Sequence, residues 1–112
     1  GSKILVLGAA YKPDIDDLRE SPALDVIALL AEKGADVEYH DPHCPSLTTN
    51  EGDTMESVPD MMASVKAADC VVIITNHSVY NYGALLDQAQ LIVDTRNALG
   101  KAGRANPKVF GL

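Results

Sequence analysis

Two positively charged side chains near the start of the chain have the type and position to bind an anionic ligand. Lys12 follows an apolar run at 4–7, and Arg19 lies two residues before Ser21-Pro22, a pair typical of a helix start. The dipole of a helix N-terminus also attracts anions. Since a hydrogen bond to a charged group contributes about 1.5–3 kcal/mol, the two cations can together anchor a diphosphate.

The same stretch admits a second interpretation, in which the two cations only offset nearby carboxylates. The acidic residues within it are Asp14, Asp16, Asp17 and Glu20. Such a cluster makes a poor free-standing phosphate site, so another domain or subunit would have to orient or neutralise it. The loop also lacks the glycines of the GxGxxG and GxxxxGK[ST] motifs. Phosphate binding is therefore left to side chains rather than to backbone amides.

Arg96 and His77 are further candidates, because each follows an apolar run that predicts a strand. The planar guanidinium of Arg96 suits phosphate or ribose oxygens, which it can address with two hydrogen bonds. The alternative for Arg96 is a surface arginine paired to Asp94, but its place at a strand end favours ligand contact. For His77 we favour a loop histidine with a local hydrogen bond over a catalytic base.

The elements that must position these residues are strands and helices in alternation. The β-branched runs at 4–7, 71–74 and 91–93 show little polar alternation, which is typical of strands covered on both faces. Val37-Glu38-Tyr39-His40 alternates instead and predicts a strand nearer an edge. A short final strand is expected at 109–110.

Three helices are expected between the strands. The first begins at Ser21-Pro22 and ends at Gly34, and the second runs from Val58 or Pro59 to Ala68. A third covers about 82–89. This alternation predicts an α/β layer fold with a mainly parallel sheet.

Ligands bind beyond the carboxyl ends of the strands in such sheets. The loops to consider follow from this rule: 8–20, 41–55, 75–81 and 94–103.

The composition predicts one small soluble domain over residues 1–112. Gly1-Ser2 has the form of a tag-cleavage remnant and is excluded. Hydrophobic residues make up 46% and aromatics only 4%, so an aliphatic core of Val, Ile, Leu and Ala is expected. The net charge of −7 argues against a nucleic-acid partner. Without a membrane-spanning stretch or a signal peptide, a cytoplasmic setting is predicted.

The cysteines give little indication of a disulfide or a metal site. Cys70 lies in the apolar run Cys70-Val71-Val72-Ile73-Ile74 and is expected to be a buried small hydrophobe. Cys44 adjoins His43, but no second pair stands at metal-ligand spacing, so a surface loop is the favoured interpretation. No metal ligand is predicted.

Four strings of residues resemble the C-terminal, UDP-binding domain of the UDP-glucose/GDP-mannose dehydrogenase family. They are KPDIDDLRESPA at 12–23, GADVEYHDP at 34–42, ADCVVIITNH at 68–77 and IVDTRNAL at 92–99. They occur in the family's order across nearly the whole chain. Their amino-acid sequence is most similar to that of the family members that oxidise UDP-N-acetylglucosamine or UDP-N-acetylmannosamine. The resemblance implies a Rossmann-like, three-layer α/β domain with a mainly parallel sheet of about five strands.

The resemblance also implies roles for particular residues. Family members oxidise the C6 alcohol of a UDP-sugar to a carboxylate in two steps and reduce two NAD. By this resemblance Tyr11 and Lys12 lie along the UDP-sugar, with Lys12 near the diphosphate, and Arg96 contacts the nucleotide. Arg19 reaches the cofactor side of the cleft between domains.

The chemistry itself is expected outside this segment. The family's nucleophile is a cysteine in a glycine-rich setting that neither Cys44 nor Cys70 has, and the GxGxxG loop for NAD is absent. The resemblance therefore implies that an N-terminal NAD-binding domain and a central domain complete the enzyme, as a homo-oligomer. This chain alone is expected to bind UDP-sugar and not to turn it over.

Two alternatives belong to other classes of protein. A free-standing regulatory domain similar to a response-regulator receiver would use Asp14, Asp16 and Asp17 as an acidic Mg²⁺ pocket. A receiver also needs an Asp at the end of its third strand, where this chain has Thr75-Asn76. An interaction module without a ligand would present Met61 and Met62 to a partner, although a Met pair at this spacing is more often core.

Overall fold

A computed structural model describes residues 2–8, 22–42, 44–49, 52–75, 80–95, 98–100 and 106–111. Its strands and helices alternate along most of the chain, as expected. In chain order they are β1 Lys3–Leu7, α1 Pro22–Glu32, β2 Asp36–His40, β3 Ser46–Thr48, β4 Thr54–Glu56, α2 Met61–Ala67, β5 Cys70–Ile73, α3 Tyr82–Gln88, β6 Ile92–Asp94 and β7 Val109–Gly111.

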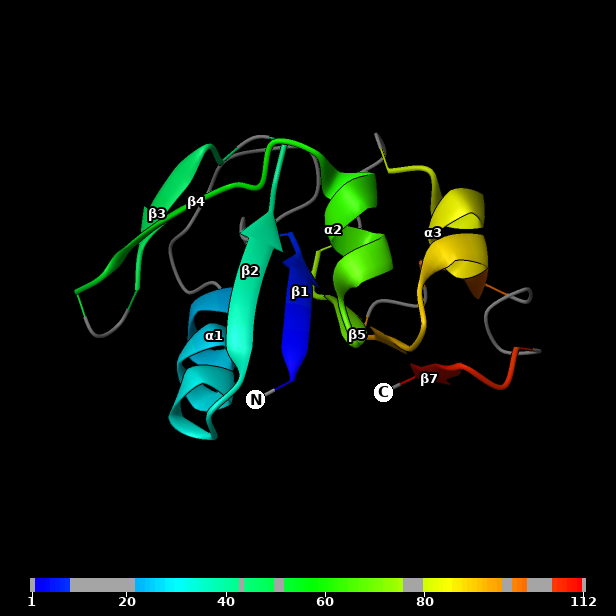
Figure 1. Cartoon of the computed structure of the whole chain (residues 1–112), viewed down its shortest axis with the longest axis horizontal. Helices are drawn as coiled ribbons and strands as arrows, with labels where there is room; N and C mark the ends of the chain where they lie inside the picture. Colours follow the sequence, from blue (N-terminus) through cyan, green and yellow to red (C-terminus); the bar gives the residue numbers. More distant parts are fainter. Residues whose placement is uncertain are drawn as a thin grey trace.

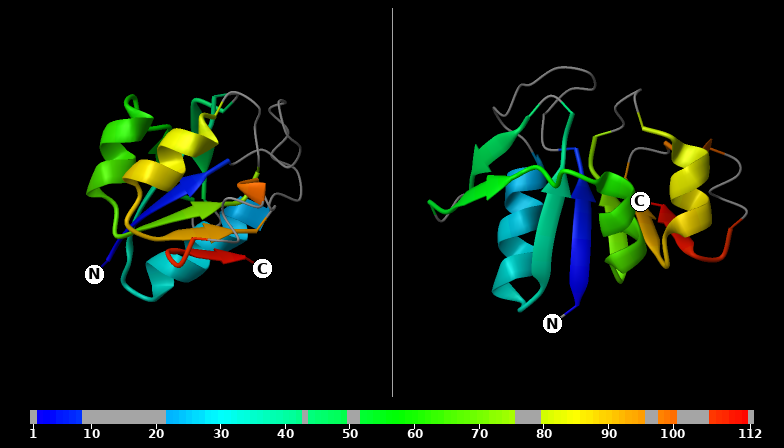
Figure 2. Two further views of the ribbon diagram at one scale, coloured as in Figure 1. Left: turned by 90° about the vertical axis from the view of Figure 1, so that its right-hand side faces the viewer. Right: turned by 45° about the horizontal axis from the view of Figure 1, so that its top comes forward.

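The main sheet has the strand order β2-β1-β5-β6-β7, and every neighbouring pair in it is parallel. Its register aligns the strand ends: Leu7 pairs with both His40 and Ile73, and Ile73 pairs with Asp94. Helices α2 and α3 cover one face of the sheet and α1 covers the other (Figures 1 and 2). The predicted three-layer α/β fold with a parallel sheet of five strands is confirmed. The predicted edge position of the strand 37–40 is confirmed as well.

Strand alternation divides the core into two clusters, one on each face of the sheet. Leu5 and Leu7 of β1 pack with α2 and α3, whereas Val6 between them packs with α1. The core is mainly aliphatic as predicted, but two tyrosines also belong to it. Tyr39 is fully buried on the α1 side, and Tyr80 is 6% exposed on the other side. Their hydroxyl groups therefore need hydrogen-bond partners inside the protein.

Helix α1 ends as its sequence predicts. Gly34 has a φ of +86°, its N–H donates to the carbonyl of Ala31, and the N–H of Ala35 donates to the carbonyl of Leu30. This is the glycine-terminated helix end that satisfies the last carbonyl groups. Ser21, the predicted N-cap of the same helix, lies outside the described residues.

Helix α2 begins later than predicted. Its N-cap is Asp60, whose carboxylate accepts the N–H of Ala63 at 3.1 Å, so the helix begins two to three residues after the predicted start. Ser57 could cap an earlier start, but its hydroxyl is bonded to the backbone of Asp41 instead. Asn81 caps α3 as Asp60 caps α2, and accepts the N–H of Ala84 at 3.0 Å. Met61 and Met62 pack against the core, as a Met pair at this spacing more often does.

A hairpin occupies the segment 41–55, which the sequence predicts as loop. Strands β3 and β4 pair antiparallel, with Leu47 opposite Met55, and the hairpin projects beyond β2 (Figure 1). Each strand has only three residues, too few to show a period in the sequence. Leu47 is nevertheless buried against the α1 side of the sheet.

Cys44 is buried, so the prediction of a surface loop is wrong for this residue. It is 4% exposed, its thiol donates to the carbonyl of Ser46 at 3.1 Å, and its own carbonyl accepts the hydroxyl of Tyr39 at 3.0 Å. Cys70 is only partly buried, and this burial raises the pKa of its thiol. Both cysteines are free thiols. His43 lies outside the described residues.

Candidate functional site

The carboxyl ends of the five parallel strands lie at one edge of the sheet. After β1 the chain passes through α1 to β2 on one side, whereas β5 lies on the other side of β1. The connections therefore diverge between β1 and β5, and such a switch point is where open α/β sheets bind ligands. Gly8 ends β1 at this place and Thr75 follows β5.

The predicted ligand-binding residues lie outside the described residues. They are Tyr11, Lys12, Arg19 and Arg96, and His77 lies outside as well. The structure instead describes the residues from which their segments depart: Gly8 before 9–21, Thr75 before 76–79, and Thr95 before 96–97. The described contacts show how these strand ends are held together. The residues that hold them, which we call the frame, are Gly8, His40, Thr75, Tyr80, Asp94 and Thr95.

Gly8 fits into a space that no other residue can occupy. Its φ is +91°, and a Cβ atom added to it would lie 2.6 Å from the Cβ of Thr75 and 2.7 Å from the backbone N and O of that residue. Its own N–H donates to the carbonyl of His40 at 2.9 Å. Gly8 is therefore held between the end of β2 and the residue that follows β5. This steric role of Gly8 was not predicted from the sequence, in which glycines were considered only as parts of phosphate-binding motifs.

Tyr80 and His40 form a second part of the frame, which the sequence analysis also missed. The Tyr80 hydroxyl donates to the carbonyl of His40 at 2.8 Å and lies 3.1 Å from Nδ1 of the same residue. The two rings are tilted, with centroids 5.5 Å apart. Burial raises the pKa of Tyr80, and the Coulombic effect of Asp41 raises it further. The phenol therefore stays protonated and remains a donor.

Asp94 and Thr95 form the third part, at the end of β6. Both carboxylate oxygens of Asp94 accept backbone N–H groups, from Ala98 and from Leu99, each at 3.0 Å. The hydroxyl of Thr95 donates to the carbonyl of Ile73 at 2.6 Å and ties the exit of β6 to β5. Asp94 is 4% exposed, so its carboxylate has a structural function in closing this turn.

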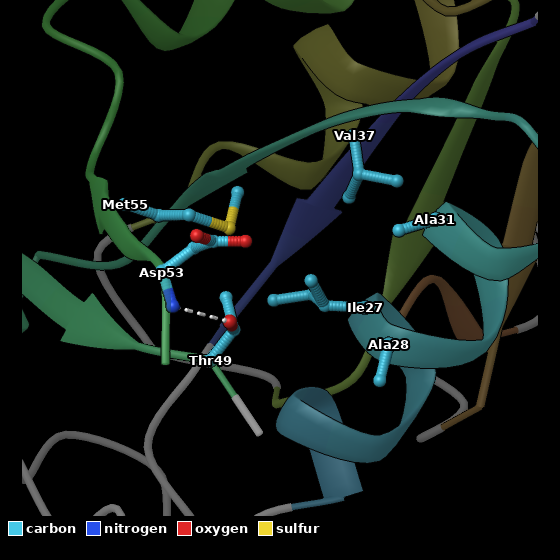
Figure 3. Close-up of a pocket in the computed structure, with 7 residues that line it drawn as sticks. All are labelled: Ile27, Ala28, Ala31, Val37, Thr49, Asp53 and Met55. Carbon is cyan, nitrogen blue, oxygen red and sulfur yellow. Dashed lines mark hydrogen bonds between the residues drawn. The ribbon is translucent and has the colours of Figure 1, made fainter. Parts of the chain in front are cut away.

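A pocket of about 190 Å³ lies elsewhere, between α1 and the β3–β4 hairpin (Figure 3). Ile27, Ala31, Val37 and Met55 give it a largely apolar lining, and Asp53 is the one charged residue among the described residues that line it. The N–H of Asp53 donates to the hydroxyl of Thr49 at 3.1 Å within the hairpin. The described part of this lining offers no cation to a diphosphate, which favours the carboxyl edge as the anion site.

Two kinds of feature are absent from the part of the chain that the structure describes. Within these ranges no three His, Cys, Asp or Glu side chains gather as a metal site. Among the described residues, no helix combines the length and apolar character needed to cross a bilayer.

Comparison with known proteins decides the family. Residues 5–101 match the description "UDP-glucose/GDP-mannose dehydrogenase family, UDP binding domain". The chain belongs to this family. The match runs from within β1 through β6 and includes the carboxyl ends of β1, β2, β5 and β6. The resemblance found in the four sequence strings is thus confirmed.

Individual members of the UDP-glucose/GDP-mannose dehydrogenase family are similar over nearly the whole chain. The UDP-N-acetyl-D-mannosamine dehydrogenase of Methanococcus vannielii is 35% identical over an alignment of 105 residues that covers 87% of this chain and 23% of that protein. The UDP-glucose 6-dehydrogenase of Rhizobium meliloti is 35% identical over an alignment of 109 residues that covers 90% of this chain and 24% of that protein. The chain therefore spans about a quarter of the length of these relatives.

A solved structure gives the same result for the fold. The UDP-glucose dehydrogenase of the archaeon Pyrobaculum islandicum superposes with a TM-score of 0.76 at 33% identity. The superposition covers 99% of this chain and 25% of that one. The resemblance to the family thus extends from sequence to tertiary structure.

Proposed function

We propose that residues 1–112 are the UDP-binding domain of a longer NAD-dependent UDP-sugar 6-dehydrogenase. The observation that carries this proposal is the family match over 5–101, which names UDP as the ligand of the matched domain. The relatives named above act on UDP-glucose or UDP-N-acetyl-D-mannosamine, so a UDP-hexose or a UDP-N-acetylhexosamine is the proposed substrate class. The longer polypeptide would supply the NAD-binding and central domains and form a homo-oligomer. The cytoplasmic setting stays a prediction.

Within this domain we assign UDP binding to Tyr11, Lys12 and Arg96. The frame supports the assignment, because the segments that carry these residues leave the same edge of the sheet, after β1 and after β6. Only β5 separates these strands, and two strand spacings amount to about 10 Å. That separation suits a diphosphate contacted from both sides by an ammonium and a guanidinium. Tyr11 would lie along the nucleotide sugar.

NAD would be bound mainly by the remaining polypeptide, with Arg19 reaching toward it from this domain. The residues present do not fit a dinucleotide cradle. GxGxxG is absent after β1, and the space that Gly8 leaves open is filled by Thr75 rather than left for a pyrophosphate. The hydride chemistry is therefore assigned outside this chain.

A free-standing receiver-like regulator has less support. The third parallel strand along the chain, β5, leads to Thr75, which is 1% exposed and has no carboxylate to phosphorylate. A receiver needs an accessible aspartate there. The family match also removes the reason for considering an unrelated regulatory domain.

Isothermal titration of the 112-residue chain with UDP tests the assignment. Lys12→Ala and Arg96→Ala are each expected to raise the Kd for UDP about tenfold, the lower end of what a charged hydrogen bond contributes. Lys33→Ala is the matched control. Lys33 is an exposed cation between the C-terminus of α1 and the start of β2, so it lies near the amino ends of the strands and not near their carboxyl ends. Its Kd should equal that of the parent. A parent that does not bind UDP, or equal Kd values in all variants, would contradict the proposal.

A further inference from the structure

Tyr80 connects parts of the protein that are distant in the sequence. It follows β5 and precedes α3, and its ring packs into the core cluster on the α2 and α3 side of the sheet. Its hydroxyl, however, contacts the end of β2, the edge strand on the far side of β1. The side chain therefore reaches across the carboxyl end of β1.

The Tyr80 hydroxyl shares its backbone acceptor with a second donor. The carbonyl of His40 accepts the Tyr80 hydroxyl at 2.8 Å and the N–H of Gly8 at 2.9 Å. Since a carbonyl has two lone pairs, both of its acceptor positions are used by these donors. The position of Gly8, and so the point where the chain leaves β1, depends on the same atom that Tyr80 holds.

The ring of His40 completes the arrangement. Because the single proton of the Tyr80 hydroxyl points to the carbonyl, Nδ1 of His40 must be the donor in its 3.1 Å contact with the phenol oxygen. The phenol is thus a donor to the backbone and an acceptor from the ring of one residue. Two bonds from one hydroxyl fix the end of β2 more firmly than a single bond would.

Gly8 directly precedes the segment 9–21, which carries the proposed UDP ligands. We infer that Tyr80 is a positioning residue for UDP binding: its hydroxyl, through the carbonyl of His40, fixes the exit of β1 from which the segment with Tyr11 and Lys12 departs. The inference rests on the proposed function, because it assigns Tyr80 to the same site. This role differs from a general stabilising one. The Tyr80 hydroxyl bonds to the carbonyl of His40, which also accepts the N–H of Gly8, the residue before that segment.

Tyr80→Phe tests the inference, since it removes only the hydroxyl and keeps the ring in the core. Loss of these hydrogen bonds should raise the Kd of the 112-residue chain for UDP about threefold to tenfold in calorimetry at a temperature where the variant is folded. Tyr39→Phe is the matched control. Tyr39 is also a buried tyrosine that donates to a backbone carbonyl, that of Cys44, but it lies on the α1 side of the sheet. Tyr39→Phe should lower the free energy of unfolding but leave the Kd for UDP equal to that of the parent.

A double-mutant cycle separates positioning from a general effect. If Tyr80 acts through the segment that carries Lys12, the increase in Kd caused by Tyr80→Phe should shrink toward onefold in a Lys12→Ala background. In the unliganded chain, amide exchange at Gly8 should become about tenfold faster in Tyr80→Phe. Exchange at Leu5, in the middle of β1, should be unchanged once global stability is matched by temperature.

The outcomes distinguish the two proposals. Binding of UDP by the parent with an unchanged Kd in Tyr80→Phe overturns the positioning role and leaves the proposed function intact. Fully additive effects of Tyr80→Phe and Lys12→Ala overturn the positioning role in the same way. A parent that binds no UDP overturns the proposed function, and the positioning role for UDP with it.

Discussion

Gly8→Ala is expected to lower the free energy of unfolding by about 2–5 kcal/mol, a large part of the stability of a small domain. A φ of +91° already disfavours any L side chain by about 1–2 kcal/mol. The added Cβ would also lie 2.6–2.7 Å from the Cβ and backbone atoms of Thr75, and such overpacking costs about 1–3 kcal/mol. The backbone atoms of Thr75, which follows β5, cannot turn away as a flexible side-chain end can, so the ends of β1 and β5 would have to move apart.

Urea unfolding followed by far-UV circular dichroism measures this loss, because the chain has no Trp for fluorescence. Gly34→Ala is the matched control. Gly34 has nearly the same φ, +86°, but a Cβ there would meet nothing within 4 Å. Its loss should be confined to the backbone part, about 1–2 kcal/mol. Equal losses in the two variants would show that contact with Thr75 is unimportant.

Asp94→Ala is expected to lower the free energy of unfolding by about 2–4 kcal/mol. The substitution removes the acceptor of two backbone N–H groups, those of Ala98 and Leu99, in a region where Leu99 is buried. Each buried donor left without a partner costs about 1–3 kcal/mol. We further expect the variant to bind UDP more weakly than the parent, because Arg96 lies in the sequence between Asp94 and the two residues that its carboxylate holds.

Two substitutions calibrate the result for Asp94 in the same urea experiment. Asp60→Ala removes an exposed carboxylate that accepts one N–H, that of Ala63, and should cost about 1 kcal/mol. Asp94→Asn keeps one acceptor oxygen and should fall between Asp94→Ala and the parent. If Asp94→Ala costs no more than Asp60→Ala, the carboxylate does not hold the turn after β6.

The sequence by itself determined the fold class and the family. Buried parallel strands need apolar residues on both faces, so the runs at 4–7, 71–74 and 91–93, which contribute most of β1, β5 and β6, are unbroken and apolar. The helix end at Gly34 was predictable because it depends on one residue and its immediate neighbours. The family strings are local in the same sense, since they can be recognised without knowing which strands are neighbours.

Hydrophobic periodicity in the sequence did not predict the short strands or the buried polar residues. The β3–β4 hairpin consists of strands of three residues, and its stability comes from packing Leu47 under α1 rather than from a pattern of its own. Cys44 appeared to be a loop residue because its neighbours are polar or proline. Its burial results from the hydroxyl of Tyr39 and from the hairpin that follows it.

Only the tertiary structure decided how the ligand-binding edge is framed. Gly8, His40 and the pair Thr75 and Tyr80 belong to three separate stretches of sequence, and nothing in those stretches shows that they meet. They meet because the strand order places β1 between β2 and β5. Periodicity reports which face of an element is buried, but it carries no information about which element lies beside it. Contacts between neighbouring strand ends are therefore a property of the folded sheet alone.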